Sequence, residues 1–165
     1  MSPRNETVLY PAVVKWLAQH LRSRHPRAKV SAFDTHKTEL SSFLRREGFH
    51  RHFPDSSAYE IEVDVTGVIE RRDSVKLAFV ECKIGPITLR DVGQLLGYSL
   101  VARPELSFLV SPRGLSDRLA AQLLTFGRQD ILVYGKDRLI RLGVWDEARG
   151  ELDVSTLVPK GCHSY

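Results

Sequence analysis

The sequence predicts an α/β domain with a mixed central β-sheet and helices on both faces, and three observations support this fold class. Residues 60–70 and 75–83 alternate charged or polar positions with Val- and Ile-rich apolar ones around a short charged turn, which predicts an antiparallel hairpin. Apolar runs at residues 106–110 and 131–134 predict buried strands joined by a helix, hence a parallel pair with a right-handed crossover. The helical segments each have one apolar face.

The N-terminal third of the chain predicts a helix, a strand and a second helix. Residues 6–24 carry apolar side chains at helical spacing, and Pro11 in the first turns marks where the regular helix begins. Residues 27–33 predict a strand. Residues 37–47 predict a short helix that ends at Gly48, a residue suited to a C-terminal cap.

Residues 49–57 are basic and aromatic and end in turn-forming residues. Two interpretations are open: a mobile loop that enters a DNA groove or contacts its backbone, and an ordinary connection. His50 and His52 lack the partner residues that a zinc site needs.

After the hairpin, residues 88–102 predict a helix that opens with a capping box formed by Thr88 and Asp91. Residues 116–126 predict the helix that joins the two apolar strands.

The C-terminal region predicts a second hairpin from residues 138–145 and 151–157. This hairpin either extends the sheet or forms a dimer contact, and Trp145 is suited to anchor either arrangement. Simple packing of Trp145 is the alternative.

Length and composition limit what the chain can be. With 165 residues, 42% of them hydrophobic, residues 1–165 predict a single domain with its own core. The net charge of +4 suits a polyanionic partner such as DNA. Residues 1–53 contain ten Lys or Arg against four Asp or Glu. A nucleic-acid face and a solvated basic surface explain this asymmetry equally well.

The two cysteines, Cys82 and Cys162, support neither a disulfide framework nor a zinc cluster. No apolar run approaches the eighteen residues of a membrane span, and the N-terminus lacks the apolar core of a signal peptide. We therefore expect a soluble cytoplasmic protein with no membrane partner.

The central hairpin concentrates charge at one end. The loop at residues 71–74 sets a register in which Asp64 lies opposite Glu81 and Glu62 lies opposite Lys83. Opposed side chains on one face have Cβ atoms about 5 Å apart. Carboxylates crowded in this way are costly unless a cation is held there, although a solvated polar face is the alternative.

This pattern resembles the motif of the PD-(D/E)xK nuclease superfamily. An Asp near one strand end is followed on the next strand by Glu-x-Lys, here Asp64 and Glu81-Cys82-Lys83. Val63 stands where the family motif has proline. The resemblance implies a restriction-endonuclease-like fold.

A second motif follows the lysine. Gln94 and Tyr98 resemble the Gln-xxx-Tyr motif of RecB-like members, and they share one face of the predicted helix. In this interpretation they hydrogen-bond a phosphate or the water shell of a metal. Ordinary helix surface and a satisfied core tyrosine are the alternatives.

Phosphodiester hydrolysis needs a nucleophilic water and positive charge near the phosphate, and a divalent metal supplies both. Mg²⁺ prefers oxygen ligands, so Asp64 and Glu81 are the predicted ligands, and Mn²⁺ is expected to substitute for Mg²⁺. The resemblance adds the backbone carbonyl of Cys82 and an acid from the first helix. Glu6 fits that position, but it equally fits a carboxylate that stabilises a helix N-terminus.

The expected activity is metal-dependent hydrolysis of DNA by an endonuclease, in which Lys83 orients the attacking water or stabilises the transition state. Two alternatives stay open: a non-cleaving DNA-binding or assembly module, and a nuclease acting on RNA or branched DNA. A homodimer is a further expectation.

Overall fold

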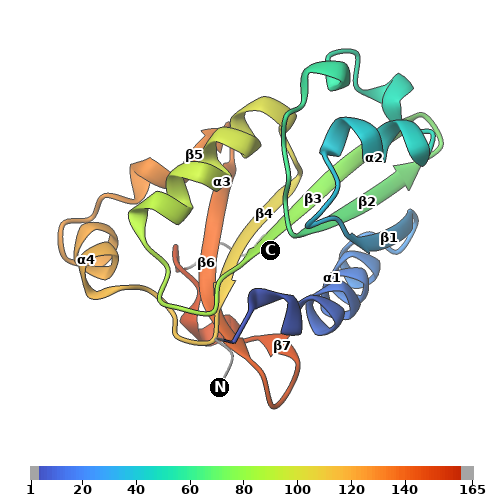
Figure 1. Cartoon of the computed structure of the whole chain (residues 1–165). Coiled ribbons are helices and arrows are strands. Elements are labelled where there is room, and N and C mark those ends of the chain that lie inside the picture. The colour runs from blue at the N-terminus through green and yellow to red at the C-terminus, as the bar shows by residue number, and fades with distance from the viewer. Residues whose placement is uncertain (1–3, 161–165) are drawn as a thin grey trace.

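Seven strands of the described residues, 4–160, form one mixed sheet in this computed structural model (Figure 1). Their bounds are β1 Lys29–Asp34, β2 Val65–Arg71, β3 Ser74–Cys82, β4 Leu106–Ser111, β5 Val133–Gly135, β6 Arg138–Asp146 and β7 Glu151–Leu152. The spatial order is β1-β2-β3-β4-β6-β5, with β7 also paired to β6. The β3/β4 and β4/β6 pairs are parallel and the others antiparallel, which confirms the predicted α/β fold class with a mixed sheet. Cys162 lies outside the described residues.

Helices cover both faces of the sheet (Figure 1). Their bounds are α1 Tyr10–Arg24, α2 Leu40–Arg46, α3 Leu89–Ala102 and α4 Asp117–Ala120. One apolar cluster lies between α1 and the sheet, and a second lies between the sheet and α2, α3 and α4. None of the helices among residues 4–160 combines the length and hydropathy needed to span a membrane.

Alternate residues of β3 pack into the two apolar clusters on opposite faces of the sheet. Leu77 and Phe79 belong to the cluster under α2 and α3, whereas Ala78 and Val80 belong to the cluster under α1. Because side chains alternate along a strand, Glu81 faces the same side as Leu77 and Phe79.

Close approach of α1 to the sheet depends on a glycine in β2. A Cβ atom at Gly67 would lie 2.6 Å from Leu21 Cδ1 and 3.0 Å from Leu17 Cδ2, both on α1. The absence of a side chain there lets the helix pack directly on the strand.

The hairpin has the predicted register. Val65 lies opposite Val80 and Glu70 lies opposite Val75. Pairing extends one step further than expected, to Arg71 with Ser74, so the turn itself has two residues instead of four.

The predicted start of this hairpin at residue 60 is wrong, because β2 begins at Val65. The preceding segment packs under α2 instead: Ile61 and Val63 are buried there, and the carbonyl of Ile61 accepts a hydrogen bond from Leu40 N–H (2.7 Å). Glu62 is exposed and does not lie in a strand opposite Lys83.

The predicted crossover is also wrong in its second strand. The parallel neighbour of β4 is β6, whereas β5 pairs antiparallel with β6. Of the strand expected over residues 131–134, Ile131 and Leu132 instead belong to the 3₁₀ turn Gln129–Leu132, and Val133 and Tyr134 lie in β5. The helix predicted over residues 116–126 is regular only to Ala120 and continues as a π-helical turn over Ala121–Thr125. The terminal hairpin is confirmed in shorter form as β6 and β7.

Trp145 anchors the cluster under α1. Its side chain is 2% exposed and meets the ring of Trp16 edge-on at 5.9 Å between centroids. We expect Trp145→Ala to lower the free energy of unfolding by about 3–5 kcal/mol, because the truncation leaves a large cavity. Urea denaturation tests this against Phe126→Ala, which removes an aromatic side chain that is 70% exposed and should change stability by less than about 0.5 kcal/mol.

Candidate functional site

Two carboxylates meet where β2 begins and β3 ends. Asp64 directly precedes β2 and Glu81 is the penultimate residue of β3, each one position beyond the last observed pair of this hairpin, Val65 with Val80. Asp64 and Glu81 are only 9% and 4% exposed, respectively. Asp64 Oδ2 accepts a hydrogen bond from the backbone N–H of Cys82 at 2.8 Å, so its carboxylate reaches across to β3.

Asp64 is held from several sides. The phenol of Tyr10, in the first turn of α1, donates to Asp64 Oδ1 at 2.8 Å. Thr35, the residue after β1, donates its backbone N–H to the carbonyl of Asp64 (2.9 Å) and its hydroxyl to the carbonyl of Val63 (2.7 Å). Both the side chain and the backbone of Asp64 are therefore fixed before any ligand binds.

Glu81 is less completely satisfied. Its Oε1 lies 3.3 Å from Lys83 Nζ, whereas its Oε2 is buried without a hydrogen-bond partner among the described residues. A buried acceptor without a donor is costly. This oxygen is therefore placed to bind a proton or a cation.

The ionisation of the site reflects burial and mutual repulsion. Burial and then the charge of Asp64 raise the pKa of Glu81 to about 7. Burial also raises the pKa of Asp64, although the Cys82 N–H and Tyr10 O–H bonds oppose this shift. Burial would lower the pKa of Lys83, but Glu81, then Glu6 and Asp64, raise it overall. The site is therefore poor in positive charge, and Lys83 stays protonated near neutral pH.

Glu6 lies in a 3₁₀ turn, Glu6–Val8, that leads into α1, and its carboxylate is 3.9 Å from Lys83 Nζ. Among residues 4–160, no three His, Cys, Asp or Glu side chains form a group that could hold a metal. Glu6 as a third ligand stays a prediction. The Cys82 side chain is buried in the cluster under α1, on the opposite side of β3 from Glu81. Ligation by the backbone carbonyl of Cys82 stays a prediction too.

Gln94 and Tyr98 lie on α3, which covers the face of the sheet that Glu81 shares. Gln94 is exposed, and its side-chain amide donates to the Tyr98 hydroxyl at 3.3 Å. Tyr98 is half-buried against the cluster under α2 and α3. In the described part of the chain, their hydrogen bonds join them to each other and not to Asp64 or Glu81, so their predicted role stays untested.

Sequence reasoning missed Tyr10, Thr35 and His36. The His36 ring lies 4.8 Å from the Tyr10 ring and also contacts the Asp34 carboxylate, so it borders the site. A signal for Tyr10 was present, because it follows Glu6 by four residues within an apolar helical stripe, and a buried tyrosine hydroxyl usually has a hydrogen-bond partner.

If these carboxylates act in the DNA hydrolysis that the sequence resemblance implies, we expect Tyr10→Phe to lower cleavage by about tenfold, which corresponds to a loss of about 1.4 kcal/mol from the orientation of Asp64. Tyr134→Phe is the matched control, since the buried Tyr134 hydroxyl donates to the carbonyl of Pro104 (2.9 Å) and lies outside the site. Both variants should lose about 1 kcal/mol of stability. Equal cleavage rates in the two variants would contradict a positioning role for Tyr10.

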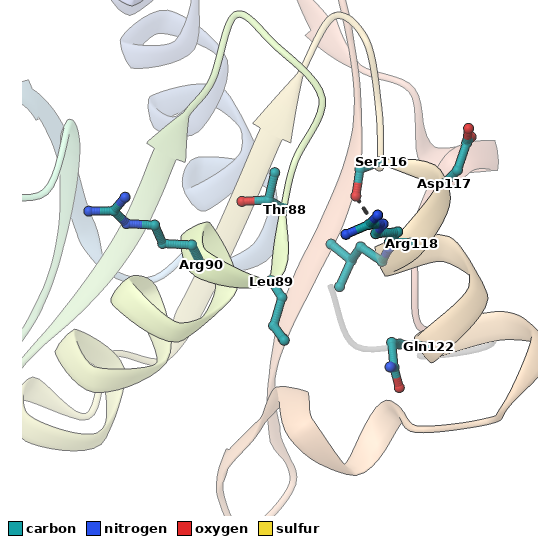
Figure 2. A pocket seen from close by; sticks show the side chains of 8 residues that line it. Thr88, Leu89, Arg90, Ser116, Asp117, Arg118 and Gln122 are labelled. Carbon is teal, nitrogen blue, oxygen red and sulfur yellow. Dashed lines mark hydrogen bonds between the residues drawn. The ribbon is translucent and has the colours of Figure 1, made fainter.

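A pocket of about 700 Å³ lies between the first turns of α3 and α4 (Figure 2). Its lining includes Thr88, Arg90, Ser116 and Arg118. The loops before the two helices run side by side, since Ile87 N–H bonds to the Gly114 carbonyl and Ser116 N–H to the Ile87 carbonyl (both 2.8 Å). These loops follow β3 and β4, so the pocket is at the same edge of the sheet as Glu81, but neither candidate carboxylate lines it.

No protein-family model matches the chain, and no curated protein is significantly similar to it in sequence. The chain is similar to a solved structure described as "Crystal Structure of Protein of Unknown Function AF1548", with 14% sequence identity and a TM-score of 0.38. The similarity covers 84% of this chain and 58% of that one, so the chain spans less than two thirds of the length of that protein.

Proposed function

We propose that this chain is a divalent-metal-dependent deoxyribonuclease of the PD-(D/E)xK type, which hydrolyses phosphodiester bonds of DNA. The supporting observation is the arrangement of three side chains at the end of the central hairpin. Asp64 and Glu81 are both buried at this end, Asp64 accepts from the N–H of Cys82 beside Glu81, Lys83 Nζ lies 3.3 Å from Glu81, and one Glu81 oxygen has no partner among the described residues.

The donor set fits Mg²⁺ or Mn²⁺. Such ions prefer oxygen ligands and keep several waters, so a small number of carboxylates is enough. Glu81 Oε2 is available to an ion, and each Asp64 oxygen accepts only one of the roughly two hydrogen bonds that a carboxylate oxygen can take. Asp64, Glu81 and the carbonyl of Cys82 would hold the metal. A bound divalent ion makes a water nucleophilic near neutral pH and offsets charge on the phosphate.

The protein residues have separate tasks in this proposal. Tyr10 and the Cys82 N–H fix the Asp64 carboxylate in one orientation. Lys83 is kept protonated by the acids around it, so it serves as a hydrogen-bond donor to a phosphate oxygen and not as a base. Its salt bridges to Glu81 and Glu6 hold the ammonium at the site before substrate arrives.

The proposal is tested by incubating purified protein with labelled duplex, single-stranded and branched DNA and with RNA, in Mg²⁺, in Mn²⁺ and in EDTA. We expect strand breakage of DNA only with a divalent metal, and none by Lys83→Ala. Cleavage of RNA or branched DNA alone would redirect the substrate assignment. DNA binding without cleavage under every metal condition would contradict the proposal and favour a non-cleaving DNA-binding module.

A further inference from the structure

A second charged feature lies at the opposite end of the central hairpin from the carboxylates. A groove of about 690 Å³ is formed between the segment after α2 and the β2–β3 turn. In Figure 1 the segment after α2 lies beside the tip of this hairpin. We call this groove the basic groove, because five exposed basic residues line it: His50, Arg51, His52, Arg71 and Arg72.

The segment after α2 is built to present these side chains. Phe49 and Phe53 pack against the cluster under α2 and α3, and His50–His52 form a 3₁₀ turn between them. Both ends of the turn are thereby anchored while its three side chains stay in solvent. The segment is therefore a 3₁₀ turn whose flanking aromatic side chains pack on the core, and its contact with DNA stays a prediction.

The acids near the basic groove are already compensated. Glu47 and Glu70 also line it, but Arg46 Nε lies 3.3 Å from the Glu47 carboxylate and Lys29 Nζ lies 3.6 Å from that of Glu70. Neither Arg46 nor Lys29 is among the lining residues. Each acid thus has a cation from outside the groove beside it, and the three arginines that line the groove outnumber the two acids that line it.

The remaining local contacts do not cancel this excess. Arg71 lies 2.9 Å from Nδ1 of His25, and a histidine carries no negative charge that could offset the charge of Arg71. Asp73, in the turn, is an exposed acid that does not line the groove. The groove is therefore net positive on an exposed surface, which suits a ligand with repeated negative charges.

One residue of the groove and one of the two carboxylates lie on β3. Val75 lines the groove, and both Val75 and Glu81 are odd-numbered positions of β3, so they face the same side of the sheet. Six residues of strand at roughly 3.3 Å each separate them by about 20 Å. This is within the length of a short duplex, which would pass over the outside of the molecule because Leu77 and Phe79 between them are buried.

We propose that the basic groove binds the phosphodiester backbone of the nucleic acid that is cut at Asp64 and Glu81, at a distance from the scissile bond. The identity of this polyanion rests on the proposed function. Arginine side chains bind phosphate with two parallel hydrogen bonds, and such contacts fix the register of a duplex without reading its sequence. The groove is thus a positioning surface for the substrate.

The test is the salt dependence of binding of a 20-base-pair duplex to the Lys83→Ala protein, in which DNA stays intact. We compare the double variant Arg51→Gln, Arg72→Gln with the control Arg128→Gln, Arg149→Gln. The control removes the same charge from exposed arginines that pair with Asp130 and Glu151, away from the groove. The groove variant should bind on the order of tenfold more weakly near 0.1 M salt, and its log–log salt slope should fall by about 2, one unit for each phosphate that the variant no longer neutralises. The control should match the parent.

Equal affinity and equal slope in the groove and control variants would overturn the proposal. Displacement of the duplex by poly-glutamate as effectively as by unlabelled DNA of equal charge would overturn the assignment to nucleic acid. The outcome is separable from the proposed function. Cleavage that persists without groove-dependent binding refutes the groove alone, whereas groove-dependent binding without cleavage in the wild-type protein refutes the nuclease assignment alone.

Discussion

Replacing Asp64 by Asn is expected to lower DNA cleavage by on the order of a thousandfold, a loss comparable with removing one charge-stabilising group from an active site. The amide keeps the shape of the side chain and one acceptor oxygen. It removes the negative charge and replaces the other acceptor with a donor, so the ability to hold a divalent cation is lost. Single-turnover cleavage of labelled DNA at saturating Mg²⁺ measures the effect.

The matched control is Glu62→Gln, the same loss of charge two residues earlier in the chain at an exposed position. This control should cleave within about twofold of the wild type, since surface substitutions away from special features have small effects. Urea denaturation of both variants separates a loss of chemistry from a loss of folding. Asp64→Asn that folds normally and still cleaves within tenfold of the wild type would contradict the assigned role of Asp64.

Replacing Glu81 by Gln is expected to stabilise the protein in the absence of metal. The pKa of Glu81 is about 7, above its usual 4.5, because burial and Asp64 disfavour the carboxylate. The folded state therefore binds this proton more tightly than the unfolded state. The contribution of Glu81 to the free energy of unfolding of the wild type is fully present below about pH 4.5 and is lost as the pH rises through about 7. Gln carries no such charge, so the variant should gain on the order of 1–3 kcal/mol relative to wild type by pH 8.

Urea denaturation in EDTA at pH 5 and pH 8 measures this difference, which should be clearly larger at pH 8. A variant that is less stable than the wild type at pH 8 would show that the Glu81 carboxylate is satisfied by the protein itself.

The same variant tests metal binding without any activity assay. A ligand that binds only the folded state adds about 2.7 kcal/mol at a concentration of one hundred times its Kd. Mn²⁺ should therefore raise the melting temperature of the wild type and of Glu62→Gln and leave Glu81→Gln nearly unchanged. Equal increases in all three proteins would place the metal elsewhere.

The hairpin and its charged end could be predicted because the information is local. A two-residue periodicity and a short turn determine the register, and the register brings the neighbours of Asp64 and Glu81, Val65 and Val80, opposite one another. The polar residues that hold Asp64 could not be found in this way. Tyr10 and Thr35 are 54 and 29 positions away along the chain, and only the packing of α1 and β1 against β2 brings them to Asp64.

The order of the strands after β4 could not be predicted from the sequence for another reason. Residues 131–134 and β6 are both apolar enough to fill the sheet, and a buried parallel strand has no alternating pattern that selects its partner. In the structure β6 has nine residues and β5 three, so the longer strand occupies the central position. The start of β2 was misplaced because Ile61 and Val63 alternate with acids as in a strand, yet they are buried beneath α2.

The central claim, that Asp64 and Glu81 hold a divalent metal, is tested most directly by anomalous diffraction from crystals of the protein soaked in Mn²⁺. The expected result is a strong anomalous peak within bonding distance of Glu81 Oε2 and of an Asp64 carboxylate oxygen, absent from crystals of Glu81→Gln. Crystals that show no manganese at these two carboxylates, or that bind it only at another place on the surface, would contradict the claim.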